Sequence, residues 1–224
     1  MNWSVQPTSD EVLREYDRIW SLLGNRKIED LVDLPLVAHP DILDVLEVLT
    51  QIVTPAVFFD KDLCALVICR MVNLSLEHGN SDASCFAYVW FGIVVGPRFG
   101  CYEEAFRFGQ LGYDLLGKRG LKRYEARTCM CFSVVVPWTK HARHCSDLAR
   151  HACDVAYRMG DFTYAAYSFA QLVTTFLVVG DPLAEAQVEA EKGVEFAKTA
   201  RVGLVVDIVG ADLQSDPHPP GIDE

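Results

Sequence analysis

The sequence predicts an all-α protein, an α-α superhelix of tetratricopeptide-like two-helix repeats with a period near 40 residues. The first observation is a series of prolines at nearly constant spacing: Pro55, Pro97, Pro137 and Pro182. The second is a set of glycines that fall between them: Gly79, Gly120 and Gly160. A sustained period of this length is typical of stacked helix pairs, in which proline marks one corner and glycine ends the second helix.

The elements follow in order along the chain. Residues 8–11, "TSDE", have the Thr-x-x-Glu spacing of a capping box and predict a helix over about 10–23, within an N-terminal helix and connector (1–40). A helical-repeat array (41–214) follows, with four repeats over about 41–79, 80–120, 121–160 and 161–201 and a partial fifth. Residues 215–224, "SDPHPPGIDE", hold three prolines and are predicted to be a disordered tail.

Small side chains recur at matching places in the second helices of successive repeats. The pairs are Gly109 and Gly112, Ala149 and Ala152, and Ala190 and Gly193. Small residues three apart share a helical face, so a neighbouring helix can approach closely there.

Composition limits the class of protein. The chain has 224 residues, half of them apolar, and a formal net charge of −11, which disfavours binding to a polyanion such as nucleic acid. The start of the chain lacks a basic and apolar leader, and uninterrupted apolar runs fall short of about 18 residues. We therefore expect a cytoplasmic protein with free thiols, no membrane span and no nucleic-acid partner.

Residues 141–153, "HARHCSDLARHAC", raise the question of a metal site. The alternative ligand set is Cys129, Cys131, His144 and Cys145. Structural zinc sites usually show tight C-x2-C and H-x3-H pairs, and neither spacing occurs here. We therefore expect no metal and no cofactor, and interpret this stretch as the second helix of the third repeat.

Catalytic motifs are equally weak. "GKRG" at 117–120 lacks the frame of a phosphate-binding loop. Glu103 and Glu104 are adjacent, so on a helix they point about 100° apart and cannot flank one bond. The sequence predicts that the chain is not an enzyme.

A basic band runs through residues 118–150 against the acidic total. It consists of Lys118, Arg119, Lys122, Arg123, Arg127, Lys140, Arg143 and Arg150. Residues 181–195 are acidic, so the two bands either pair with each other or leave a docking face for an acidic segment. The candidate interaction surface is Arg119, Lys122, Arg123, Arg127, Lys140 and Arg143.

The last predicted repeat is incomplete, because the sequence predicts a first helix from near residue 202 and no second helix after it. Leu204, Val205 and Ile208 would then lack part of their cover. This predicts an association face and a homodimer through the C-terminal partial repeat.

Several stretches resemble the helical-repeat region of large bacterial and fungal multi-sensor signalling kinases: "RKIEDLVDLPL", "CRMVNLSLEHGNSDASCFAYVWFGIVVGPRFG", "FRFGQLGYDL" and "ARVGLVVDIV". Those proteins join a serine/threonine-kinase-like domain, an NTPase domain, this region, a GAF sensor and a histidine kinase. The likeness covers about residues 9–210 and implies a non-catalytic connector whose partners are neighbouring kinase domains. This chain lacks the motifs of those domains, which suggests a truncated or orphan copy of the region.

The sequence thus favours a scaffold or regulatory module for protein–protein or interdomain contacts in signal transduction. Two alternatives remain open. One is a sensor that holds a small ligand in an apolar groove, and the other is a metal or thiol-redox sensor.

Overall fold

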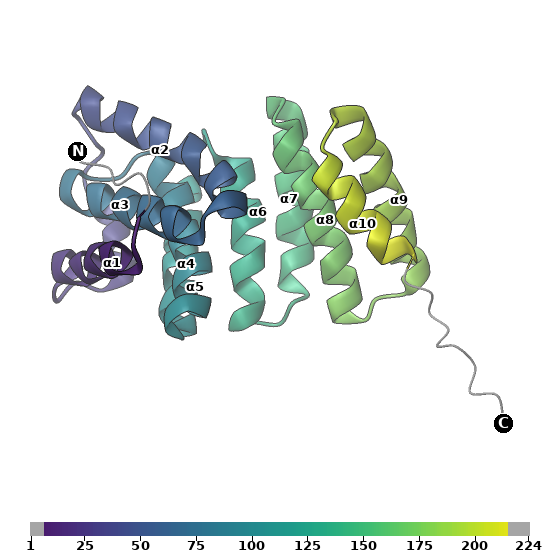
Figure 1. Cartoon of the computed structure of the whole chain (residues 1–224), viewed down its shortest axis with the longest axis horizontal. Coiled ribbons are helices and arrows are strands. Elements are labelled where there is room, and N and C mark those ends of the chain that lie inside the picture. Colours follow the sequence, from purple (N-terminus) through teal and green to yellow (C-terminus); the bar gives the residue numbers. More distant parts are fainter. Residues whose placement is uncertain (1–6, 215–224) are drawn as a thin grey trace.

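A computed structural model describes residues 7–214, which form ten α-helices, two short 3-10 helices and a single isolated bridge between Leu36 and Asn80. The helices stand side by side in a row, with α1 to α3 at one end and α9 and α10 at the other (Figure 1). The prediction of an all-α fold is confirmed. The predicted tail, 215–224, lies outside the described residues.

The N-terminal part begins with α1 (Ser9–Leu23), whose predicted capping box is present. The Thr8 side chain accepts a hydrogen bond from the Glu11 backbone N–H, and the Glu11 carboxylate accepts one from Thr8 N at 2.8 Å. A connector with the 3-10 helix η1 (Ile28–Asp33) follows and packs against α5. Helix α1 itself packs against α3.

The rest of the described chain consists of successive helix pairs. They are α2 (Pro40–Phe59) with α3 (Lys61–His78), α4 (Asp82–Phe99) with α5 (Tyr102–Lys118), α6 (Glu125–Val135) with α7 (His144–Met159), and α8 (Phe162–Val179) with α9 (Leu183–Ala200). Helix α10 (Gly203–Gln214) follows without a partner of its own among the described residues. Gly79, Gly120 and Gly160 have positive φ and lie at the ends of α3, α5 and α7, as predicted.

The proline-centred corners are wrong for the first two pairs. Pro55 and Pro97 lie inside α2 and α4, which continue to Phe59 and Phe99. A proline in the last turn removes only one backbone donor, so the helix can continue for a few residues. Asp60 then caps α3 with its side chain. Pro137 does end α6, in the 3-10 helix η2 (Val136–Trp138), and Pro182 caps α9.

We call α2, α4, α6, α8 and α10 the leading helices, because each begins a pair or stands where a pair would begin. Each leading helix from α2 to α8 contacts the next leading helix as well as the helix that follows it in the chain, and α10 contacts α8 and α9. These sequential contacts are compatible with a helical repeat.

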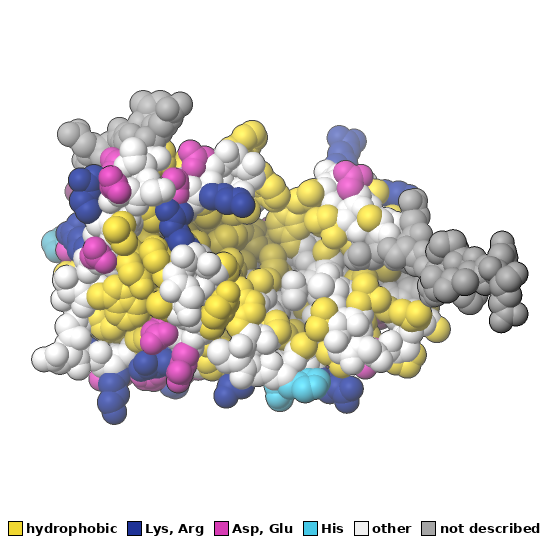
Figure 2. Space-filling model, turned by 60° about the horizontal axis from the view of Figure 1, so that its bottom comes forward, with side chains coloured by type: hydrophobic (Ala, Val, Ile, Leu, Met, Phe, Trp, Pro, Cys, Tyr) yellow, Lys and Arg dark blue, Asp and Glu magenta, His cyan; other side chains and the backbone are white. Residues whose placement is uncertain are grey.

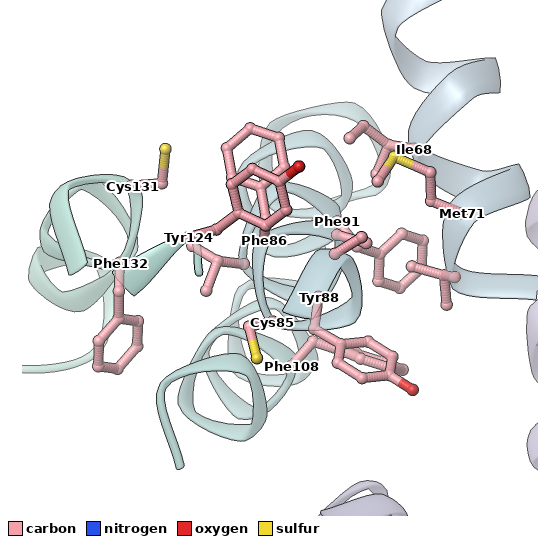
Figure 3. Packing of buried hydrophobic residues seen from close by; sticks show 14 of the residues in the cluster. Ile68, Met71, Cys85, Phe86, Tyr88, Phe91, Phe108, Tyr124, Cys131 and Phe132 are labelled. Carbon is pink, nitrogen blue, oxygen red and sulfur yellow. The ribbon is translucent and has the colours of Figure 1, made fainter. Parts of the chain in front are cut away.

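The core is continuous through the first three pairs. Its largest fully buried side chains include Tyr88, Phe86, Phe91 and Phe108. Figure 3 shows them around α4, with Ile68 and Met71 of α3 on one side and Phe132 of α6 on the other. Phe91 and Phe108 meet edge to face, with ring centroids 4.8 Å apart. Aromatic residues supply large buried areas, so this cluster anchors α4 and α5 to their neighbours.

Two glycines allow α4 and α5 to approach closely. A Cβ at Gly92 would lie 2.5 Å from the carbonyl oxygen of Ala105, and one at Gly112 would clash with the carbonyl oxygen of Cys85. The predicted role of Gly112 in close packing is therefore confirmed.

Within residues 7–214, two helices are long and apolar enough to cross a membrane by length and composition alone. They are α2 and α8, with mean hydropathies of 1.7 and 1.4. Core helices of soluble proteins pass the same test, and both helices pack against other leading helices here.

Candidate functional site

An apolar groove opens between the leading helices, and we call it the inner groove. Its volume is about 340 Å³. Its lining comes from all five leading helices: Thr54, Val57, Phe58, Trp90, Met130, Val134, Tyr164, Tyr167, Ala170, Gln171, Thr174, Leu204 and Ile208. None of these side chains is a charged acid or base. The space-filling view shows hydrophobic side chains gathered in a hollow near the middle of the molecule (Figure 2).

Several apolar side chains of the groove are open to solvent. Phe58 is 57% exposed, Ile208 43% and Leu204 39%. Large exposed apolar side chains that converge from separate elements are typical of interaction sites, whereas isolated ones need no explanation.

A few polar groups stand among the apolar ones. The hydroxyls of Thr54 and Tyr164 lie 3.2 Å apart, which ties α2 to α8 across the groove. Burial raises the pKa of Tyr164, so its hydroxyl stays protonated and can serve as a donor. Tyr167 and Gln171, one turn apart on α8, are only partly buried at the same wall.

A charged network lies next to the groove, at the start of α6. Arg127 donates from Nε to Oδ2 of Asp161 at 2.7 Å, and its guanidinium lies 4.9 Å from the ring centroid of Tyr164. Tyr124 donates from its hydroxyl to the carboxylate of Glu47 at 2.5 Å, and burial followed by this bond raises the pKa of Tyr124 to about 12. Arg123 pairs with the same carboxylate at 3.1 Å.

The predicted association face is divided by the fold. Leu204 and Ile208 are exposed in the inner groove, but Val205 is fully buried with Val209 against α8 and α9. Residues 204 and 208 share one helical face, while 205 and 209 share the next, which faces the neighbouring helices. The inclusion of Val205 in a surface was therefore wrong.

The basic band is spread over several contacts. Lys122 lies 4.0 Å from Glu125, and Arg119 donates to the carbonyl oxygen of Val32 at 3.1 Å. Lys118 and Lys122 border a second hollow of about 310 Å³ together with Asp114, Glu125 and His151. Its lining thus combines cations with acids.

The more distal cations also have partners. Arg143 lies 3.8 Å from Asp181, and Arg150 lies 3.7 Å from Glu189, so the basic and acidic bands do meet across α7 and α9. Lys140 stands 5.3 Å from the ring centroid of Phe106. This pairing agrees with the first of the two interpretations that the sequence left open. Arg119 and Lys140 contact a carbonyl oxygen and a ring and not an acid, so the band as a docking face stays a prediction.

The alternative metal ligands are not brought together. Cys129, Cys131 and Cys145 are buried, whereas His144 is exposed at the start of α7. Within residues 7–214, no group of three or more His, Cys, Asp or Glu side chains is placed to hold a metal ion.

The cysteines are all free thiols, and burial shapes their chemistry. Burial raises the pKa of Cys129 to about 12 and of Cys145 to about 11. Because the thiolate is the reactive form, such thiols are poor redox sensors.

No family model, curated protein or solved structure matches this chain. Apart from Leu204 and Ile208, the residues of the inner groove were not identified from the sequence, because its lining combines side chains from positions 54 to 208. A sequence signal for the groove does exist. Each leading helix has an apolar face that its packing partners do not fully cover.

Proposed function

We propose that the chain is a non-catalytic binding module, a tetratricopeptide-like α-α superhelix whose inner groove holds an apolar segment of a partner polypeptide. In the cytoplasmic signalling role that the family resemblance implies, that partner belongs to a signalling assembly or to a neighbouring kinase domain.

One observation carries this proposal. Five helices from different parts of the chain contribute to a single open groove whose lining holds no charged side chain. Burial of apolar surface is the main favourable term in most protein association, and aromatic anchors contribute most of it. Phe58, Trp90 and Tyr167 supply such anchors.

The experiment is a selection of displayed random peptides on the purified chain. We expect enriched sequences with apolar residues at regular intervals. An Ile208→Arg variant should lose their binding by at least about tenfold, since a charge would then stand in an uncharged groove. Val188→Arg is the matched control, because Val188 is 49% exposed on α9, outside the groove.

Circular dichroism and melting curves of both variants establish that they fold like the parent chain. If the selection yields no peptide that distinguishes the parent from Ile208→Arg, while both remain folded, the groove is not a polypeptide site.

A small apolar ligand is the second candidate, favoured by the hydroxyl and amide groups of Tyr167 and Gln171 in an otherwise apolar wall. A volume of about 340 Å³ falls at the lower end of small-molecule pockets. Native mass spectrometry of the purified chain distinguishes the two functions. A bound small molecule that is lost in Ile208→Arg would favour the ligand sensor.

Homodimerisation remains a separate prediction, now restricted to Leu204 and Ile208. Multi-angle light scattering of the parent chain and of Ile208→Arg tests it. A dimer in the parent that becomes a monomer in the variant would support it, and a monomer in both would exclude it at the concentration used.

A further inference from the structure

The inner groove has the chemistry of a site for proline-rich, extended polypeptide. Its walls present the rings of Phe58, Trp90 and Tyr167, and the lining has no charged side chain. Polyproline II segments dock into aromatic-lined grooves, and they lose little conformational entropy because proline already fixes their backbone.

The chain carries such a segment directly after α10. Residues 215–224 read "SDPHPPGIDE", in which Pro217 and Pro220 form a Pro-x-x-Pro pair. A polyproline II helix has three residues per turn, so these two rings would lie on one face. Pro219 lies between them, and its ring would fall on another face.

The segment is tethered beside the groove. Ile208 and Leu204 line it from α10, which ends at Gln214. At 1.5 Å per helical residue, Ile208 lies about 9 Å back from Gln214, and Leu204 about 15 Å. With Ser215 and Asp216 in the turn, an extended segment at about 3.1 Å per residue that runs back along α10 from Pro217 would bring Pro220 level with Ile208 and Ile222 level with Leu204.

The charges at the end of this segment are consistent with a path that runs back along α10. The segment ends in Asp223 and Glu224, which would extend past Leu204 towards the start of α10. Arg201 stands there, exposed, and makes no ion pair within residues 7–214. Its charge would complement the two acids.

We propose that residues 215–224 occupy the inner groove of their own chain, with Pro217 and Pro220 against its aromatic rings. The inference rests on the groove being the binding site proposed above. A short tether gives a segment an effective concentration in the millimolar range. A partner must therefore displace it, and the groove is regulated by the chain that forms it.

The test uses the full chain and a full-length variant in which Pro217, Pro219 and Pro220 are replaced by Ala. A fluorescein-labelled peptide with the sequence of residues 215–224 is titrated into each, and binding is followed by fluorescence anisotropy. We expect the variant to bind the peptide about tenfold more tightly than the parent, because a segment at millimolar effective concentration no longer competes.

Two controls define the site. Ile208→Arg in the variant background should abolish peptide binding, and Val188→Arg should leave it unchanged. A peptide with Ala in place of Pro217 and Pro220 should bind weakly to every chain.

Equal binding to parent and variant would overturn the intramolecular occupancy. Absence of binding to either would overturn the preference for proline-rich segments, while the selection of displayed peptides would still decide whether the groove binds polypeptide. A parent dimer that becomes monomeric when the prolines are replaced would also overturn the proposal, in favour of exchange between two copies.

Discussion

Arg127 and Asp161 form a partly buried ion pair that joins α6 to α8, with Nε and Oδ2 2.7 Å apart. The guanidinium of Arg127 also lies over the rings of Tyr124 and Tyr164, at 5.4 and 4.9 Å from their centroids. Asp161 has a second role, because its other oxygen accepts the backbone N–H of Tyr164 and caps α8. A partly buried cation of the predicted surface thus holds two leading helices together.

The first prediction concerns Asp161→Ala. The change leaves Arg127 between two aromatic rings without its anionic partner and removes the cap of α8. We expect a loss of about 2–3 kcal/mol in the free energy of unfolding, less than for a fully buried pair because both side chains are about one-fifth exposed. Urea unfolding followed by circular dichroism measures it.

Asp154→Ala is the control, because Asp154 is exposed on α7 and its side chain makes no ion pair within the described chain. It should change stability by less than about 0.5 kcal/mol. If Asp161→Ala is equally mild, the Arg127–Asp161 pair contributes nothing net, and Arg127 is free to serve a partner.

The helix pairs could be predicted from the sequence because their ends are marked locally. Gly79, Gly120 and Gly160 lie at the ends of second helices with positive φ, a local backbone requirement that favours glycine. Pro55 and Pro97 misplaced two corners because proline in a last turn looks the same in sequence as proline after it. Local sequence signals therefore predicted the positions of the helix pairs more accurately than the corner between the two helices of a pair.

The inner groove, and the partners that the cations of the basic band contact, depend on packing between residues far apart in the sequence. Thr54 and Tyr164 meet across 110 positions, and Arg123 reaches Glu47 in the first pair. The periodic pattern of the sequence does not indicate which of several cations will form an ion pair with an acid on another helix. The exposure of Leu204 beside the burial of Val205 likewise depends on where α8 and α9 lie.

The second prediction concerns Asn80, which lies between α3 and α4. Asn80 is fully buried, donates from Nδ2 to the carbonyl oxygen of Leu31 at 2.8 Å and accepts from the hydroxyl of Tyr88 at 3.1 Å. Its backbone also bonds both Pro35 and Val37. It therefore clamps the connector to the start of α4.

Asn80→Ala should lower the free energy of unfolding by about 2–3 kcal/mol, because buried polar groups lose their partners. Asn25→Ala, at an exposed position after α1, should change it by less than about 0.5 kcal/mol. Thermal and urea unfolding measure both. Equal effects would mean that the side chain of Asn80 contributes nothing net to holding the connector.

The third prediction uses two glycines of α5. Gly112→Ala places a methyl group against the backbone of Cys85, which cannot move without shifting α4, so we expect a loss of about 3 kcal/mol. Gly117→Ala meets no atom within 4 Å and should stabilise the chain by about 0.5 kcal/mol, since alanine favours a helix. Urea unfolding compares the two. A neutral Gly112→Ala would show that α4 and α5 can separate without loss.

The last prediction concerns the alkylation of Cys153, which is partly exposed on α7. Burial, followed by the nearby charges of Asp154 and Glu189, raises the pKa of its thiol to about 11. The thiolate fraction increases about tenfold per pH unit while the pH stays below the pKa. The iodoacetamide labelling rate of Cys153, read by peptide mass mapping, should therefore increase steadily from pH 7.5 to 9.5. A model thiol with the usual pKa of about 8.5 should level off in that range. A plateau for Cys153 below pH 9, with the circular dichroism spectrum unchanged, would mean that this thiol is activated, and the thiol-sensor alternative would then regain support.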